Sequence, residues 1–372
     1  MSRYKIVHLT SVHAPFDTRI FYKECVTLAR AGYDVTLVAP HEQDQRVDGV
    51  QIRAVSKPAN RQERMKRTVR QVYQTAIQED GDVYHFHDPE LFLPSLLLKR
   101  RGKKVVYDIH ENLPAQILGK TYLRPSVLRH FVTRTAAFSE KLAAFVFDGL
   151  VIANPRVAER FSAPNAIALA NYPWRTMIDE ALPAETMPAS KPVAIYVGGL
   201  TAIRGVCELI DAMALLDGMA ELWLLGPWAS QTLQAQCMAK PGWRHVRYLG
   251  YVTPKEVYGY LKLADIGLAT LHPQHNYLTN LPVKAFEYMA CSLPVVMSDF
   301  PYWREVFEGA ALFVNPQSPE AIAGAIRRLL AHPEEARALG RAGRRMVEEE
   351  YSWERESSKL LAFYERLLTD SA

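Results

Sequence analysis

Lys284 and Glu287 lie three residues apart in the stretch NLPVKAFEYMACSLPVV, which begins at Asn280. Pro282 suits the first turn of a helix, so both side chains are expected on one helical face. Backbone N–H groups and the helix dipole favour a bound anion at such an end, and Lys284 adds a positive charge, which suits a phosphate group. Glu287, one turn further along, suits the paired hydroxyls of a ribose. The alternative is an ordinary salt-bridged pair on a solvated helix face.

A second candidate phosphate contact lies in YVGGLTAIRGVCELIDAM, residues 196–213. Gly198 and Gly199 follow an expected strand, and Arg204 precedes an expected helix. Glycines let a backbone approach a ligand closely, and the planar guanidinium of Arg204 can bind a diphosphate. The segment lacks the G-x-x-x-x-G-K-[ST] pattern of a phosphate loop, so a plain turn between strand and helix is the alternative.

Three titratable residues, Asp108, His110 and Glu111, occur together in YDIHENLP at the end of another expected strand. The carboxyl ends of parallel strands are where α/β proteins bind their ligands, and a histidine exchanges protons near neutral pH. Asp108 and His110 alternate onto one side of the strand, so we expect them to act together. The alternative is a capping cluster for the next helix.

The segment HFHDPELFLP could suggest a metal site, because His85 and His87 share one face of a strand and Asp88 follows. The sequence offers no convincing third ligand, and the Asp-Pro pair fits a helix N-cap equally well. We therefore predict no metal. Asp17 and Arg19, in APFDTRIFYKE beyond the first expected strand, are either ligands at the site or a helix cap and its salt bridge.

The elements that position these residues are short β-branched runs alternating with helical segments, which predicts parallel sheets. The runs KIVHLTSV, DVTLVAP, DVYHFHD, KVVYDIH and GLVIANP come first; VAIYVGG, AELWLLG, VRYLGYV, IGLATLHP, LPVVMSD and AALFVNP follow a proline-rich stretch at 173–192. We predict an α/β protein with two Rossmann-like, doubly wound domains, residues 1–175 and 190–350, which face each other across a cleft that holds the site. Residues 351–372 should form a C-terminal helix that packs back toward the first domain.

Length and composition agree with two globular domains: 372 residues, 49% hydrophobic and 23% charged. The N-terminus lacks a signal-peptide pattern, and no segment offers about 18 uninterrupted apolar residues, so we expect a cytoplasmic protein. Four scattered cysteines without a C-x-x-C pair indicate a reduced compartment, with neither disulfides nor a zinc site.

Charge is unevenly distributed along the chain. Residues 1–165 carry 25 Lys and Arg against 17 Asp and Glu, a net charge of +8, whereas the whole chain carries +4. A basic first domain indicates an anionic partner, and solvated basic helix faces are the alternative. We expect the partner to be an anionic membrane surface, with the protein peripheral on the inner face of the cell membrane, and we expect no nucleic acid.

The segments YVGGLTAIRG, ADIGLATLHP and above all NLPVKAFEYMACSLPVV, with YDIHE and HDPEL in the first half, resemble the nucleotide-sugar glycosyltransferases of the GT-B fold. The resemblance is to family 4, the retaining transferases, and is strongest from about residue 190 to residue 350. It implies that Arg204 and Lys284 bind the donor diphosphate, that Glu287 binds the ribose, and that His110 lines the donor sugar and acceptor. The implied catalytic residues are His110, Arg204 and Lys284. The implied donor-binding residues are Gly198, Gly199, Arg204, Tyr251, Thr279, Asn280, Leu281, Pro282, Lys284 and Glu287; the implied acceptor-side residues are Asp17, Arg19, Asp88 and Glu111.

Two departures from the family pattern bear on the donor. Many relatives have an arginine where this chain has Gly199, with Arg204 in the place of the usual lysine, which implies weaker or shared diphosphate binding. Many relatives also have a glutamate at the position of Thr279, so Thr279 or Asn280 is expected to supply a neutral contact to the donor sugar.

The resemblance implies sugar transfer with retained configuration, by same-face attack in which the leaving phosphate helps to deprotonate the acceptor. Fixed cations at the phosphates stabilise the charge that develops there, so we expect no cofactor and no metal. We favour a UDP-sugar over a GDP-sugar as donor, and a glycan or polyprenyl-diphosphate-linked acceptor in surface polysaccharide synthesis. The alternatives are a nucleotide-sugar 2-epimerase of similar architecture and a two-domain sugar-binding protein without catalysis.

Overall fold

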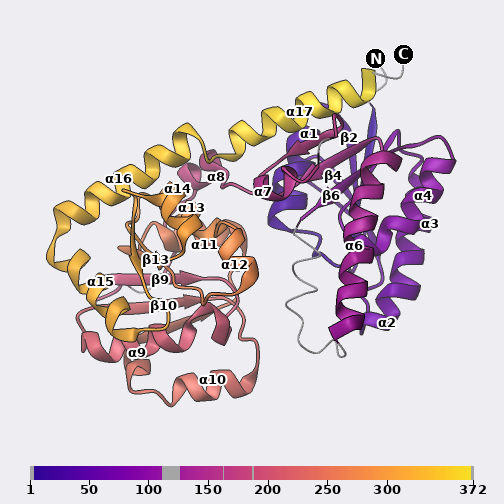
Figure 1. The fold of residues 1–372 in the computed structure, drawn as a ribbon. Helices are drawn as coiled ribbons and strands as arrows, with labels where there is room; N and C mark the ends of the chain where they lie inside the picture. Colours follow the sequence, from indigo (N-terminus) through magenta and orange to yellow (C-terminus); the bar gives the residue numbers. More distant parts are fainter. Residues whose placement is uncertain (1–3, 111–125, 162, 187, 370–372) are drawn as a thin grey trace. The chain divides into compact units, whose positions relative to one another are not determined.

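A computed structural model describes residues 4–110, 126–161, 163–186 and 188–369 (Figure 1). The chain divides into two compact units. The first unit comprises Met1–Asn171 together with Glu354–Ala372, and the second comprises Tyr172–Trp353. The first unit is therefore assembled from two separate parts of the sequence.

The first unit is built on an eight-stranded sheet with the strand order β3-β4-β2-β1-β5-β6-β7-β8. Neighbouring strands are parallel, except that β3 and β4 pair as an antiparallel edge. Buried aliphatic side chains fill the central strands, as expected for a parallel sheet that is covered on both faces. The strands are β1 (Lys5–Leu9), β2 (Asp34–Pro40), β3 (Gln45–Val47), β4 (Val50–Val55), β5 (Val83–Phe86), β6 (Lys104–Ile109), β7 (Gly149–Ile152) and β8 (Ala166–Ala168).

Side-chain alternation along these strands divides the first unit into two layers. Val7, Tyr84 and Val105 belong to a core with helices α3, α4 and α6. His8, His85 and Asp108 alternate with them, and Arg19 and Tyr364, from η1 and α17, bond to this second set. The helical segments are η1 (Thr18–Cys25), α1 (Val26–Arg30), α2 (Arg61–Glu63), η2 (Arg64–Thr68), α3 (Val69–Glu79), η3 (Pro89–Leu91), α4 (Phe92–Arg100), α6 (Ser126–Val146), α7 (Pro155–Ala158) and α17 (Trp353–Thr369).

The second unit has a six-stranded parallel sheet with the order β11-β10-β9-β12-β13-β14 and a hydrophobic core cluster on each face. Its strands are β9 (Val193–Val197), β10 (Glu221–Leu225), β11 (Val246–Gly250), β12 (Ile266–Ala269), β13 (Val295–Ser298) and β14 (Ala311–Val314). Its helical segments are α8 (Arg175–Glu180), η4 (Ala202–Arg204), α9 (Val206–Leu216), α10 (Gln231–Met238), η5 (Pro241–His245), α11 (Pro254–Leu261), α12 (His275–Thr279), α13 (Val283–Ala290), α14 (Pro301–Phe307), α15 (Pro319–Ala331) and α16 (Pro333–Glu349). The two doubly wound α/β units agree with the predicted fold class, and the short helix α8 lies within the proline-rich stretch.

Helix α17, from the end of the chain, docks on the first unit (Figure 1). The backbone N–H of Ala170 donates to the buried Glu356 carboxylate at 2.7 Å, and Tyr364 bonds to His85 at 2.8 Å. Phe363 packs directly over β7 at Gly149, where a Cβ atom would lie 2.3 Å from the ring. Only glycine leaves room for that ring.

Gly149→Ala should therefore destabilise the first unit by about 1–3 kcal/mol, because the added methyl group overpacks against Phe363. The free energy of unfolding can be measured by urea denaturation. Gly324→Ala on α15 is the matched control, since no atom lies within 4 Å of the added Cβ, and it should leave stability unchanged or raise it. Equal stability of Gly149→Ala and the parent would contradict this packing.

The described part of the chain bears on two features, membrane-spanning helices and disulfide bonds. No helix there is long and apolar enough to cross a membrane. All four cysteines are free, although the sulfur atoms of Cys207 and Cys237 lie 3.6 Å apart.

Candidate functional site

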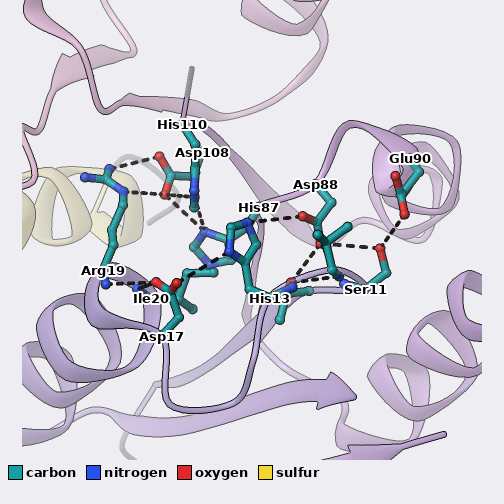
Figure 2. Close-up of polar contacts among 12 residues, drawn as sticks. Ser11, His13, Asp17, Arg19, Ile20, His87, Asp88, Glu90, Asp108 and His110 are labelled. Atoms are coloured by element: carbon teal, nitrogen blue, oxygen red, sulfur yellow. Dashed lines mark hydrogen bonds and ion pairs between the residues drawn. The ribbon is translucent and has the colours of Figure 1, made fainter. Parts of the chain in front are cut away.

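A polar cluster gathers at the carboxyl ends of β1, β5 and β6 in the first unit (Figure 2). Asp88, which follows β5, accepts hydrogen bonds from the Thr10 hydroxyl at 2.8 Å and the Ser11 backbone N–H at 2.6 Å. Its carboxylate thus fixes the loop after β1. Asp88 also precedes η3 as the N-cap residue, but its side chain makes no capping hydrogen bond there.

Asp17 and Arg19 begin the helical segment η1 and take different roles. Asp17 is the N-cap residue, and its carboxylate accepts from the backbone N–H groups of Arg19 and Ile20 at 2.8 and 3.0 Å. The Arg19 guanidinium is buried and donates to both oxygens of Asp108 at 3.0 and 3.1 Å. The structure therefore shows the cap and the ion pair that the sequence offered as one alternative, with Arg19 paired to Asp108.

Asp108 and His110 meet as strand alternation predicted. His110 Nε2 lies 2.8 Å from Asp108 Oδ2, and His87 Nδ1 lies 3.0 Å from the same oxygen. Burial alone would raise the pKa of Asp108, but Arg19 and His110 outweigh it and hold the pKa well below its ordinary value. Because the carboxylate is ionised, both histidine nitrogens donate to it, so Nδ1 of His110 keeps its lone pair. His110 is thus arranged to accept a proton.

The pKa values of the two neighbouring histidines shift in opposite directions. Burial lowers the pKa of His87 to about 4, despite the hydrogen bond to Asp108, so His87 is neutral near neutral pH. Burial acts in the same direction on His13, but the carboxylates of Asp17 and Asp88, each 3.5 Å away, raise the pKa of His13 above its ordinary value. The His13 and His110 rings lie 4.9 Å apart between centroids, so a histidine that gains a proton readily stands beside one arranged as a base.

A hollow of about 470 Å³ opens beside this cluster; its lining includes Ser11, His13, His41, Lys57 and Arg64. Sequence reasoning did not single out His8, His13 or Glu24, which the structure adds to the cluster. For His8, a signal was available: the predicted strands β1 and β5 each contain a histidine, and His8 and His85 are direct partners in the parallel pairing. Glu111 lies outside the described residues.

In the second unit, the turn after β9 brings two cations together. Gly198 has φ +124°, a conformation that favours glycine, and a Cβ atom there would lie 3.3 Å from both Arg204 Nη1 and Lys284 Nζ. A Cβ atom on Gly199 would lie 3.4 Å from the same Arg204 nitrogen. The two cations that sequence reasoning proposed therefore lie over the predicted diglycine turn.

Lys284, on the first turn of α13, has a buried ammonium group. Although part of its side chain is exposed, its Nζ is buried, has no hydrogen-bond partner among the described residues, and lies 3.7 Å from the centre of the Tyr196 ring. Burial, and then the neighbouring Arg204, lower the pKa of Lys284 well below its ordinary value. A buried ammonium beside a second cation is expensive unless an anion is bound.

The other predicted donor residues lie in or before α13, apart from Tyr251. Pro282 is the N-cap residue of this helix, and Glu287 is half-buried one turn after Lys284. The Asn280 carbonyl accepts from the Trp303 indole at 2.8 Å, which fixes the segment that contains Leu281. Thr279 ends α12, and Tyr251, after β11, is 73% exposed.

Two domain models match the chain. Residues 191–332 match the model described as glycosyl transferases group 1, and residues 19–168 match the model described as a glycosyl transferase 4-like domain. The two matches fall in different structural units.

Curated relatives of known name are similar over part of the chain. An alpha-maltose-1-phosphate synthase of Mycolicibacterium smegmatis is 27% identical over 53% of this chain and 54% of its own length. The O-antigen chain mannosyltransferase B of Escherichia coli is 28% identical over 56% of this chain and 59% of its own length. The chain thus spans about half the length of the curated relatives it matches.

Solved structures are similar over nearly the whole chain. A sucrose-phosphate synthase from Thermosynechococcus elongatus superposes with a TM-score of 0.77 at 17% identity, covering 99% of this chain and 100% of the other. Anabaena HepE in complex with UDP-glucose gives a TM-score of 0.72 at 13% identity, covering 97% and 99%. At such identities the likeness establishes the fold.

Proposed function

This chain belongs to the group 1 glycosyl transferases of the GT-B fold, and on that premise we propose that it moves a sugar from a nucleoside diphosphate donor to an acceptor hydroxyl with retention of configuration. The proposed acceptor is a glycan or a polyprenyl-diphosphate-linked sugar of surface polysaccharide synthesis. UDP-sugars are favoured over GDP-sugars as donors.

The observation that carries the proposal is the pair of cations over the Gly198 turn. Lys284 Nζ is buried without a hydrogen-bond acceptor, and Arg204 lies over both glycines. A diphosphate at this turn would satisfy the ammonium and neutralise both charges. Since Arg204 covers the space next to Gly199, its guanidinium takes up the role that an arginine at 199 has in many relatives. Glu287 then serves as the ribose partner.

These cations also fit the chemistry of transfer. As the bond between sugar and phosphate breaks, negative charge grows on the leaving diphosphate, and fixed cations at Arg204 and Lys284 stabilise it. We therefore propose that donor cleavage needs no divalent metal. The first unit supplies the acceptor side, and the hollow beside His13 and Arg64 would hold the acceptor. His110 would accept or relay the proton of the acceptor hydroxyl, and the leaving phosphate would assist in removing that proton.

The names of relatives support this substrate class. Anabaena HepE is described in complex with UDP-glucose, and a Mycobacterium tuberculosis relative is named as a GDP-mannose-dependent phosphatidylinositol dimannoside mannosyltransferase. A thermal-shift panel of UDP, GDP and their sugars would identify the nucleobase of the donor. A ligand at about 100 times its Kd should raise the free energy of unfolding by about 2.7 kcal/mol. No shift with either diphosphate would contradict the proposal. Consumption of the donor sugar only when a sugar acceptor is present separates transfer from epimerisation.

Exposed apolar side chains on α4 and α6 are a candidate membrane contact. Leu93 and Phe145 are 72% and 89% exposed, and Leu97 and Leu142 are also exposed. Lys99 of α4 pairs at 2.6 Å with Asp148, which follows α6. Exposed basic residues on or next to the same helices are Arg100, Arg101, Arg134 and Lys141. Apolar side chains among basic ones suit the surface of an anionic bilayer, where a lipid-linked acceptor would be found.

Binding to vesicles that contain anionic lipid should fall strongly when Leu93 and Phe145 are both changed to Ser, and it should weaken with salt. Each basic side chain near the surface contributes about 1 kcal/mol, and the apolar pair adds burial in the interface. Vesicle sedimentation measures the bound fraction. Leu182→Ser, at a residue of the second unit that is 83% exposed, is the matched control and should bind like the parent. Equal binding to neutral and anionic vesicles would refute the assignment.

A further inference from the structure

Beneath the polar cluster, the first unit contains a second group of ionisable side chains that the proposed transfer reaction does not use. His8 of β1 and His85 of β5 are direct partners in the register of the two parallel strands, so both side chains point to the same face. Glu24 of η1 faces them, and His87 completes the group. Each of the four residues offers a ligand atom within 4.8 Å of the others, and His8, Glu24 and His85 are fully buried.

The hydrogen bonds of this group define which nitrogen atoms carry lone pairs. His87 Nδ1 donates to the ionised Asp108, so His87 Nε2 must be an acceptor. His8 Nδ1 lies 3.0 Å from that Nε2 and therefore donates to it. The remaining nitrogen, His8 Nε2, then carries a lone pair, and it has no hydrogen-bond partner in the described part of the chain.

His85 is arranged in a similar way, and a carboxylate oxygen of Glu24 lies 4.0 Å from its Nδ1. His85 Nδ1 lies 2.8 Å from the Tyr364 hydroxyl, whereas its Nε2 has no partner among the residues that the structure describes. Glu24 forms a buried ion pair with Arg19, whose Nε lies 3.0 Å from one carboxylate oxygen and donates its hydrogen bond to Asp108. Buried acceptors without partners are costly, so two such imidazole nitrogens beside a buried carboxylate point to a bound cation.

We propose that Nε2 of His8, Nε2 of His85 and the Glu24 carboxylate bind a divalent transition-metal ion, with zinc as the preferred ion. Two imidazoles and one carboxylate form a common ligand set for such ions. Ligand histidines normally donate their second ring nitrogen to an acceptor, and His8 and His85 have His87 and Tyr364 in those positions. The ion would join β1, β5, η1 and, through Tyr364, α17, so its role is structural. It is separate from the donor cations, which belong to the second unit.

Metal content tests this site without any substrate, so the outcome is independent of the proposed transferase function. Chelator-treated protein is incubated with zinc, desalted and measured by inductively coupled plasma mass spectrometry and by thermal denaturation. The parent should retain stoichiometric zinc and melt at a higher temperature. The double variant His8→Gln/His85→Gln should lose the ion, and His332→Gln, at an exposed histidine, is the control that should retain it.

A double change in a buried cluster can also prevent folding, so the parent is tested by a second measurement. Cobalt added to the metal-free parent should give visible d–d absorption bands of a low-coordinate site, and zinc should abolish them. A parent that retains no zinc and gives no such bands overturns the proposal. Equal zinc in the parent and in a folded double variant overturns it as well.

Discussion

Lys284→Met is expected to weaken binding of the donor's nucleoside diphosphate by roughly 10- to 150-fold, through loss of a charge-assisted contact worth about 1.5–3 kcal/mol. The same change should raise the stability of the ligand-free protein, because it removes a buried ammonium that lacks an acceptor among the described residues. Isothermal titration calorimetry and thermal denaturation measure the two effects separately.

The opposite signs of these effects make the Lys284 test specific. Lys191→Met, at an exposed lysine of the same unit, is the control and should change neither quantity. Affinity that matches the parent would remove Lys284 from the donor site. A loss of stability in the ligand-free variant would show instead that Lys284 serves the fold. Arg204→Ala should weaken binding and turnover together, since its cation meets the phosphates before and during bond cleavage.

The second large effect is expected for His110→Ala, which should lower the transfer rate by about 10²–10⁴-fold, the usual range for loss of a general base. Donor affinity should stay at the parent value, because the cations that bind the diphosphate belong to the second unit. The partner Asp108 keeps Arg19 and His87, so the fold should persist. Turnover of the donor and calorimetry of the diphosphate measure the two parts.

His332→Ala serves as the matched control for the loss of a histidine elsewhere and should leave turnover unchanged. If His110→Ala unfolds the first unit, the residue is part of a capping cluster as the sequence alternative held. If it transfers sugar at the parent rate, the proton leaves through the donor phosphate alone.

The strands of the second unit were all predictable from the sequence, because each is a short apolar run closed by Gly, Pro, Asn or Asp. In the first unit, the runs that form β1, β2, β5, β6 and β7 gave the same signal. The strands β3, β4 and β8 were missed: β4 mixes buried and half-buried side chains, and β3 and β8 are each three residues long. Edge and near-edge strands carry weaker patterns than the buried centre of a sheet.

Some contacts of the candidate site were also predictable from the sequence, and others were not. Asp108 with His110 was predictable from alternation along one strand, and the family resemblance implied that Lys284 and Arg204 bind the same diphosphate. The contacts of Arg19 with Asp108, or of His85 with Tyr364, join residues far apart in the sequence. Such contacts depend on which strands become neighbours, which a single sequence does not specify.

The discontinuous first unit has a consequence for biosynthesis. Residues up to Asn171 leave the ribosome well before α17, so Gly149 and His85 stay without Phe363 and Tyr364 until the last segment of the chain is made. The second unit is continuous in the sequence and can complete its core as soon as it has emerged. Although domains usually fold in the order of their synthesis, here the unit that is started first should be the last to reach its native state. Through that interval, the nascent chain exposes the β7 surface on which Phe363 will pack, which is where a chaperone would be expected to bind.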